Sequence, residues 1–245
     1  MKKGVIVLAH RADGSSVPIA EWYAEGLRAR GHADVHVAFH DGDPNIADIL
    51  KEMNVHGMNN TFIILPLILS EGNLTVWEMP KRMGMPDNSC SYTYLTGTHI
   101  AIRFSTAFGS CEAVPKALLQ RLEEAGATEN DGILLISHGS KMSMCGKDME
   151  HHMRYLSEHG FPLLTACVLE NEGQSLEDGI ETLIDRGAER IVLLPVFIFG
   201  GRSVTETIPE KVCKMNLSIP VVHAECIGRS QYLLDELEGK IPEGW

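Results

Sequence analysis

Residues 132–140 read Gly132-Ile-Leu-Leu-Ile-Ser-His138-Gly-Ser, an apolar run that stops at a histidine followed by a glycine. The bulky apolar residues predict a strand that is buried on both faces, as in a parallel sheet covered by helices on both sides. In an open α/β sheet, ligands bind at the carboxyl ends of the strands. We therefore expect His138, at the end of this strand, to face a ligand site.

The chain opens with a second copy of this pattern, Gly4-Val-Ile-Val-Leu-Ala-His10. The two histidines are 128 residues apart, and three further pairs are 129 apart: Pro66 with Pro195, Gly72 with Gly201, and Pro80 with Pro209. Such a repeat predicts two similar βα halves, residues 1–126 and 132–245, on either side of a polar seam at 127–131. We expect the halves to face each other across a cleft.

Each half is expected to hold a parallel four-stranded sheet flanked by helices, an α/β fold. In the first half we expect strands at 5–9, 34–39, 61–69 and 99–104, and irregular chain at 85–94. The helices of that half are expected at about 17–30, 45–53 and 112–124, with another opening at 70–73. The second half repeats the order, with strands at 133–137, 163–169, 191–197 and 221–225 and helices at about 147–158, 175–186, 204–215 and 230–237.

The net charge of -12 argues against nucleic acid or an anionic membrane as the main partner, because both require a basic surface. It leaves room for an anionic small molecule held by a few Arg and Lys side chains. The six cysteines form no CxxC pair, which favours reduced thiols over a metal cluster. The first apolar run, residues 5–9, is too short for a signal peptide, so we expect a cytoplasmic protein.

Polar groups follow three predicted strands of the second half. His138 ends the first strand, as His10 does in the other half, and a histidine there offers a ring nitrogen to a metal or a proton to a substrate. A histidine that merely hydrogen-bonds a loop is the plainer alternative. Glu170 ends the second strand, where a carboxylate ligates a cation, accepts a proton or caps the next helix.

The third strand of the second half runs into Gly200-Gly201-Arg202-Ser203 before a helix. Two glycines let the backbone approach a ligand closely, and a helix start presents free N–H groups to an anion. Arg202 can pair with a carboxylate through two N–H groups, which suits a polyanionic ligand. A glycine-rich helix entry with a surface arginine is the alternative interpretation.

Three stretches together resemble the class II chelatases of the sirohydrochlorin family, the CbiX, CbiK and SirB type, which insert cobalt, iron or nickel into a tetrapyrrole. They are Ser137-His138-Gly139-Ser140, Leu169-Glu170 followed by Ser175-Leu-Glu-Asp, and Pro195-Val-Phe-Ile-Phe-Gly-Gly-Arg-Ser-Val-Thr-Glu-Thr-Ile-Pro209. The resemblance covers nearly the whole chain. It implies a lyase of cobalamin or siroheme biosynthesis, active as a monomer or homodimer, with Co²⁺, Ni²⁺ or Fe²⁺ as substrate.

By this resemblance, His138 is one metal ligand, Glu170 is a nearby ligand or proton acceptor, and His10 joins them as a catalytic group. The second histidine of the family should follow Gly201-Arg202, but position 203 is Ser, and its counterpart in the first half is Leu74. Another ligand has to complete the site, for which the candidates are Glu206, Glu172, His40 and His10. The carboxylates of the macrocycle need cations, and Arg11, Lys141 and Arg202 are the candidates by position. Gly200, Gly201 and Ser203 are expected to bind the macrocycle with them.

Other functions compete with metal insertion. Because the second histidine is missing, the alternative is that this chain is a non-catalytic relative of the chelatases, which binds a tetrapyrrole or a metal. A histidine phosphatase uses Arg-His-Gly after a strand, whereas Ser137 precedes His138 here. The chain has no GxxxxGK[ST] phosphate loop, so we expect no nucleotide cofactor. His151-His152 on a predicted helix is interpreted as a solvated helix face.

Overall fold

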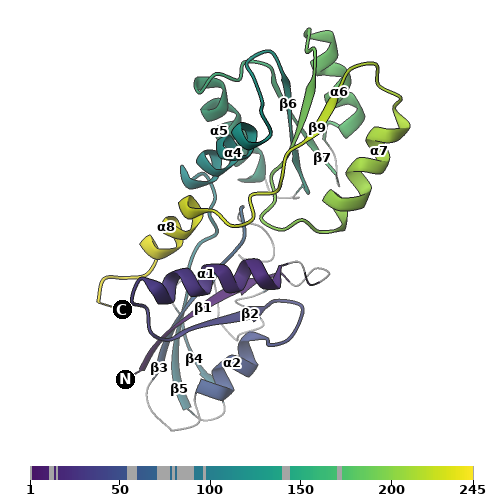
Figure 1. Ribbon diagram of the computed structural model, residues 1–245. Helices are drawn as coiled ribbons and strands as arrows, with labels where there is room; N and C mark the ends of the chain where they lie inside the picture. The colour runs from purple at the N-terminus through teal and green to yellow at the C-terminus, as the bar shows by residue number, and fades with distance from the viewer. Residues whose placement is uncertain are drawn as a thin grey trace. The chain divides into compact units, whose positions relative to one another are not determined.

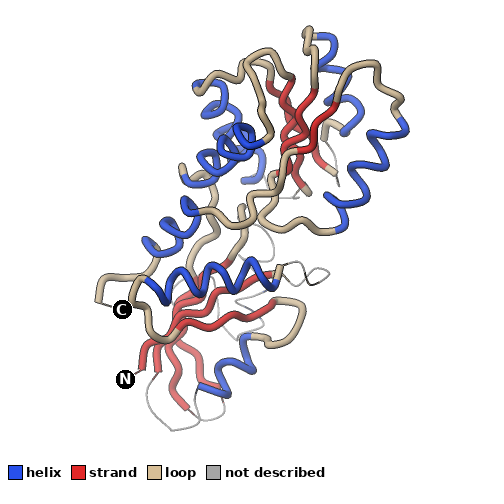
Figure 2. The backbone as a smooth tube through the Cα atoms, in the orientation of Figure 1, coloured by secondary structure: helices blue, strands red, loops and turns tan. Residues whose placement is uncertain are grey.

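The computed structural model describes residues 2–10, 14, 16–53, 60–70, 78, 81, 91–95, 98–139, 144–169 and 173–244. The chain divides into two compact units (Figures 1 and 2). Residues 1–109 and 233–245 form the first unit, and residues 110–232 form the second. None of the helices in the described part of the chain is long and apolar enough to cross a membrane.

The sheet of the first unit has the strand order β2-β1-β3-β5-β4. Its strands are β1 (Lys2–Ala9), β2 (Val35–Phe39), β3 (Asn60–Pro66), β4 (Ser91–Leu95) and β5 (Thr98–Phe104). The first four in this order pair in parallel, as the sequence predicts. The prediction of four strands was incomplete, because β4 pairs antiparallel with β5 in a stretch expected to be irregular. Residues 96–97 separate these strands, so a short local pairing adds an edge strand outside the repeat.

Among the described residues, the first unit includes the helices α1 (Val17–Ala29), α2 (Ile46–Met53) and the last helix of the chain, α8 (Gln231–Gly239). One face of the sheet, with Ile6, Leu8 and Phe62, forms a buried core with Ile49 and Leu50 of α2. The alternate residues of β1 are also buried, as expected for a strand covered on both faces.

The second unit holds a parallel sheet of the order β7-β6-β8-β9, which matches β2-β1-β3-β5 of the first unit. The strands are β6 (Gly132–Ser137), β7 (Leu164–Val168), β8 (Ile191–Pro195) and β9 (Val221–His223). The helices are α4 (Ala113–Glu124), α5 (Met144–Glu158), α6 (Leu176–Asp185) and α7 (Ile208–Lys214), with a π-helix, η2 (Ser203–Thr207), before α7. The matching order confirms the predicted duplication.

Close packing positions α6 on this sheet. Ser175 caps the helix by accepting a hydrogen bond from the backbone N–H of Asp178 (3.1 Å). A Cβ added at Gly179 would lie 2.7 Å from Leu134 Cδ1, so only glycine allows the helix this close approach to β6. Leu134 and Leu176 belong to the core on this face of the sheet.

The compact units are not the two sequence repeats, because the repeats exchange their last helices. Helix α4 follows the strands of the first repeat but belongs to the second unit, where it contacts α5 and β8. Helix α8 follows the strands of the second repeat and packs on α1, where Arg30 forms ion pairs with Asp235 (2.5 Å) and Glu238 (2.6 Å). The predicted seam at 127–131 therefore lies inside the second unit.

In or just after each exchanged helix, one basic side chain donates hydrogen bonds to backbone carbonyls of a loop. Arg121 of α4 donates from Nη2 to the carbonyl oxygens of Ile227 (2.7 Å) and Arg229 (3.1 Å). Lys240, which follows α8, donates from Nζ to the carbonyl oxygens of Ala107 (2.8 Å) and Thr106 (3.2 Å). In each unit the loop follows the strand that ends the parallel series, β9 or β5.

The two loops have the same backbone. Gly109 and Gly228 adopt φ angles of 58° and 57°, and each donates its N–H to a carbonyl after β3 or β8, that of Leu69 or Ile198. The glycines are 119 residues apart, as are Arg121 and Lys240. The repeat is therefore preserved in these glycine hydrogen bonds, although Arg121 and Lys240 bond carbonyls at different positions of the loop. We call the two basic contacts the reciprocal latches.

Candidate functional site

His138 lies where β6 ends, and its side chain is exposed. Backbone bonds continue past the strand ends on both sides of it: Leu169 N–H donates to Ser137 O (3.0 Å), and Val196 N–H donates to Ile136 O (2.8 Å). The chain therefore leaves β6, β7 and β8 at one edge of the sheet. The ring of His138 meets Phe197 edge-on, with the centroids 6.5 Å apart. The predicted partner Glu170, and Glu172 and Lys141, lie outside the described residues.

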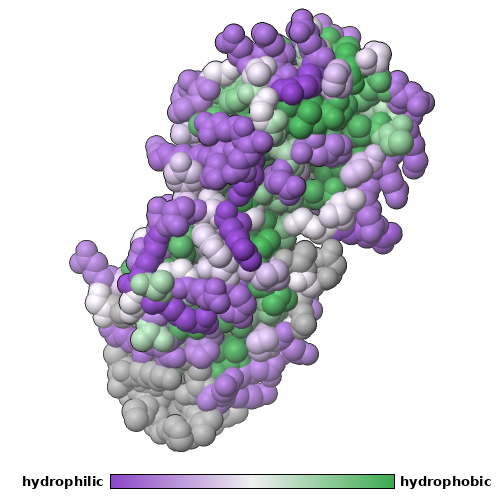
Figure 3. All heavy atoms as spheres, in the orientation of Figure 1, coloured by the Kyte–Doolittle hydropathy of each residue, from purple (hydrophilic) through white to green (hydrophobic). Residues whose placement is uncertain are grey.

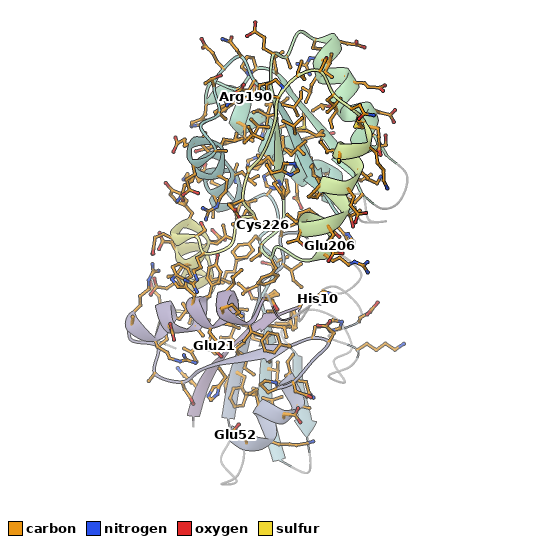
Figure 4. All side chains as sticks on the ribbon, turned by 45° about the vertical axis from the view of Figure 1, so that its right-hand side comes forward. His10, Glu21, Glu52, Arg190, Glu206 and Cys226 are labelled. Carbon is orange, nitrogen blue, oxygen red and sulfur yellow. The ribbon has the colours of Figure 1, made fainter. Side chains whose placement is uncertain are left out.

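The first unit repeats this arrangement around His10. His40 N–H donates to Ala9 O (2.9 Å), and Leu67 N–H donates to Leu8 O (2.8 Å). His10 Nδ1 lies 2.9 Å from Asp41 Oδ2, and the rings of His10 and His40 meet edge-on at 6.2 Å. Figure 4 shows His10 at the end of its strand. Arg11, predicted as a cation for the macrocycle, and Leu74, the counterpart of Ser203, lie outside the described residues.

Asp41 occupies one ring nitrogen of His10. With Nδ1–H donating to the carboxylate, Nε2 keeps its lone pair for a metal or a proton. His10 is about half exposed, at 54%, so this nitrogen is accessible to solvent. The sequence placed His10 and Asp41 just after two predicted strands but did not predict their contact. Whether the two side chains meet depends on the conformation of the loops after these strands.

The segment after β8 forms the second part of the predicted site. The N–H groups of Val204 and Thr205 donate to Gly201 O (2.9 and 3.1 Å), and η2 begins at Ser203. Arg202 Nε donates to Glu206 Oε2 (2.8 Å) along the outside of this helix, and both side chains are exposed. Arg202, predicted for a substrate carboxylate, and Glu206, predicted for the metal, therefore pair with each other here. Figure 4 labels Glu206 in the second unit.

No preformed metal centre exists among the described residues, because no three His, Cys, Asp or Glu side chains there converge as ligands. The geometry provides single donors at strand ends instead: His138 in one unit, and His10 with Asp41 in the other. A metal ion bound by one or two protein donors keeps water in its other coordination positions, and these water ligands exchange rapidly.

Comparison with known proteins identifies the fold and the family together. The family model for CbiX matches the chain twice, at residues 4–125 and 132–243. The chain belongs to the CbiX family. The two matches follow the sequence repeats rather than the compact units, so each CbiX repeat contributes its last helix to the other unit.

Curated relatives of this CbiX-family chain are sirohydrochlorin chelatases. A sirohydrochlorin cobaltochelatase of Sulfolobus acidocaldarius is 28% identical over 44% of this chain and 88% of its own length. The chloroplastic sirohydrochlorin ferrochelatase of Arabidopsis thaliana is 27% identical over 57% of this chain, and the match spans 60% of the relative. Both names describe metal insertion, with different metals.

Solved structures share the fold at lower identity. SirB from Bacillus subtilis with Fe³⁺ superposes with a TM-score of 0.77 at 20% identity, over 98% of this chain and 94% of that chain. A structure of CbiX, named as the terminal enzyme for siroheme biosynthesis in denitrifying bacteria, gives 0.64 at 17% identity over 98% and 100%. These likenesses confirm the predicted CbiX-type βα fold.

One sequence interpretation of the CbiX-family chain was wrong. His152 was expected on a solvated helix face, but only 2% of it is exposed. The pKa of His152 is lowered to about 4, chiefly by burial and also by the charge of His151, while Asp148 opposes both effects. Helix α5 contacts both α4 and β7, and the local sequence does not reveal which of its faces these contacts bury.

Sequence reasoning also missed a pocket in the second unit. It lies between β8, the end of β9, η2 and α7, and has a volume of about 320 Å³. Its lining comprises Leu193, Pro195, Val204, Thr205, Ile208, Pro209, His223, Ala224 and Glu225. The signal that sequence reasoning overlooked is the alternation His223-Ala-Glu225 at the end of a predicted strand, because alternate residues share one face of a sheet.

Proposed function

We propose that this CbiX-family protein inserts Co²⁺, Ni²⁺ or Fe²⁺ into a sirohydrochlorin-type tetrapyrrole without ATP. The observation that carries the proposal is the CbiX match over both repeats, with a histidine at the end of the first strand of each. The curated sirohydrochlorin chelatases support the same substrate class. Their different metals leave the choice of ion to direct assay.

Metal insertion imposes three tasks on the site. The site must hold the ion loosely, orient the macrocycle, and accept the two protons that leave the pyrrole nitrogens as the metal enters. In the proposal, His138 binds the incoming ion together with Glu170. His10, oriented by Asp41 at 2.9 Å, accepts a proton through Nε2.

Contacts to the macrocycle are assigned to the segment after β8. Gly200 and Gly201 are half-buried and have no side chains to keep a flat ligand from their backbone, and Ser203 begins η2. Arg202 binds a peripheral carboxylate by exchanging it for Glu206, its present partner at 2.8 Å. That exchange frees Glu206 as a further ligand, and Arg11 is the corresponding cation of the first repeat.

The test is a chelation assay with the full chain. Sirohydrochlorin and each of the three ions are mixed anaerobically, and the change in the tetrapyrrole absorption spectrum is followed with and without protein. We expect a rate above the spontaneous reaction that His138→Ala reduces by two orders of magnitude or more, in line with the loss of a metal ligand or proton acceptor. The matched control is His159→Ala, which changes an exposed histidine that bonds the carbonyl of Tyr155 (2.7 Å) and stacks on the Tyr155 ring.

A second function is favoured by Ser203, which stands where the resemblance expects a metal-binding histidine. A protein that binds the tetrapyrrole without inserting metal would bind it tightly and leave the spontaneous rate unchanged. The same assay separates the two functions, because the binding protein shows a spectral change on mixing but no acceleration.

A further inference from the structure

The pocket on the second unit combines an apolar wall with unpaired polar groups. Leu193 and Pro195 of β8 form its floor, and Val204 and Ile208 form the side toward η2 and α7. Apolar surface gathers on the face of the second unit where β9 and α7 lie (Figure 3). The volume of about 320 Å³ is in the range of pockets for small ligands.

Two donor side chains enter this pocket from one face of an extended segment. His223 pairs with Leu193 in the sheet, and Ala224 N–H donates to Leu193 O (2.9 Å), so the chain runs on beside β8 past the end of β9. Side chains of an extended chain alternate, and His223 and Glu225 therefore point to the same side. Both line the pocket.

Neither donor side chain has a hydrogen-bond or ion-pair partner in the described part of the chain. The imidazole of His223 offers a ring nitrogen to a ligand in the pocket. The hydroxyl of Thr205 donates to Gly201 O (3.4 Å), which leaves its oxygen lone pairs directed elsewhere. The pocket thus offers one imidazole nitrogen, one carboxylate and one hydroxyl oxygen.

These donors select the charge and the kind of ligand. The carboxylate of Glu225 repels the carboxylates of a tetrapyrrole, so the pocket does not suit the peripheral groups of the macrocycle. A neutral imidazole with a carboxylate suits borderline first-row ions such as Co²⁺ and Ni²⁺. Four retained waters occupy about 120 Å³ at roughly 30 Å³ each, which the cavity accommodates.

We propose that His223 and Glu225 form a loading site that holds one divalent first-row metal ion, with Thr205 as a third oxygen donor or the partner of a bound water. The inference rests on the proposed function only where it calls the bound ion a substrate for chelation, because metal binding in the pocket does not depend on chelation. Two firm protein ligands give an open and exchangeable site, as a substrate ion requires. Thr205 bonds Gly201 through both its N–H and its hydroxyl, so the loading site adjoins the glycines of the predicted site.

The test measures metal binding without tetrapyrrole. Metal-free full-length protein is titrated with Co²⁺ and followed by visible absorption and calorimetry, for the unchanged protein, His223→Ala and Glu225→Gln. We expect each variant to lose one Co²⁺ equivalent or to bind it at least about tenfold more weakly. Glu210→Gln on α7 is the control for removing a negative charge near the pocket, and it should leave this equivalent unchanged.

Glu225→Gln preserves size and removes only the charge, so its circular dichroism spectrum should match that of the unchanged protein. Unaltered Co²⁺ binding in both His223→Ala and Glu225→Gln overturns the loading site, whatever the chelation assay shows. In that assay the loading site predicts a KM for metal that rises several-fold in Glu225→Gln with kcat unchanged. Failure of the proposed function would be seen separately: the unchanged protein would bind Co²⁺ in the pocket but would not accelerate chelation.

Discussion

The buried His152 makes the stability of the second unit depend on pH. It lies on α5 close to Asp148, whose Oδ1 accepts a hydrogen bond from Ser110 Oγ (2.5 Å). Neither His152 Nδ1 nor Asp148 Oδ2 has a partner in the described structure. Because protonation would place a charge in this buried position, burial lowers the pKa of His152 from 6.5 to about 4.

The drop corresponds, at 1.36 kcal/mol per pKa unit, to about 3 kcal/mol. The unfolded chain binds the proton more tightly than the folded chain, so acid favours unfolding. This contribution to stability is complete above pH 6.5 and is lost progressively as the pH falls from 6.5 toward 4. It then adds to the loss from carboxylates such as Asp131, whose pKa is lowered chiefly by a hydrogen bond from Arg190.

The assay is urea unfolding at pH 7.5, 6, 5 and 4.5, followed by circular dichroism because residues 110–232, which form the second unit, include no tryptophan. As the pH falls from 7.5 to 4.5, we expect the free energy of unfolding to decrease less in His152→Gln than in the unchanged protein. The difference between the two decreases should reach up to about 3 kcal/mol. His159→Gln, a change at an exposed histidine, should follow the unchanged protein. Equal pH dependence in His152→Gln and the unchanged protein would refute the burial argument.

Other changes test the fold and the site. Removing either reciprocal latch, by Arg121→Ala or Lys240→Ala, leaves two backbone carbonyls without a charged donor and should cost about 1.5–3 kcal/mol in urea unfolding; an unchanged midpoint contradicts this role. Gly26→Ala places a Cβ 2.5 Å from Leu234 Cδ2 and should destabilise the first unit by about 1–3 kcal/mol, whereas Gly146→Ala, with open space around it on α5, should stabilise by up to about 1 kcal/mol. Ser203→His restores the histidine implied by the family resemblance and should tighten Co²⁺ binding in calorimetry; no change would show that position 203 does not face the metal.

The sequence predicted the features that local pattern controls. Apolar runs such as Ile133–Ile136 are continuous because both faces of the strand are covered, and their ends located His10 and His138 correctly. The repeat predicted the shared strand order, because equal spacing of proline and glycine between strands requires equal crossovers.

Features that depend on long-range packing were not predictable. The exchange of α4 and α8 leaves the periodicity of each helix unchanged, since an apolar face packs equally well on either sheet. The burial of His152 depends on the neighbour of α5, and the Arg202–Glu206 pair depends on the conformation of η2. The pairing of β4 arises from two short segments whose composition did not distinguish a strand from a loop.

The glycine contacts show the same division. Gly179 is required by its approach to Leu134, and Gly26 by its approach to Leu234, yet neither sequence context differs from that of an ordinary helical glycine. Only the packing partner, which is distant in sequence, makes the residue necessary.

The central claim is that His138 participates in metal insertion, and the chelation rate of His138→Ala tests it most directly. The rate with sirohydrochlorin and Co²⁺ is compared among the unchanged protein, His138→Ala and the control His159→Ala, each with an unaltered circular dichroism spectrum. The account predicts acceleration by the unchanged protein and the control, and a loss of at least about a hundredfold in His138→Ala. An equal rate in His138→Ala and His159→Ala would contradict it.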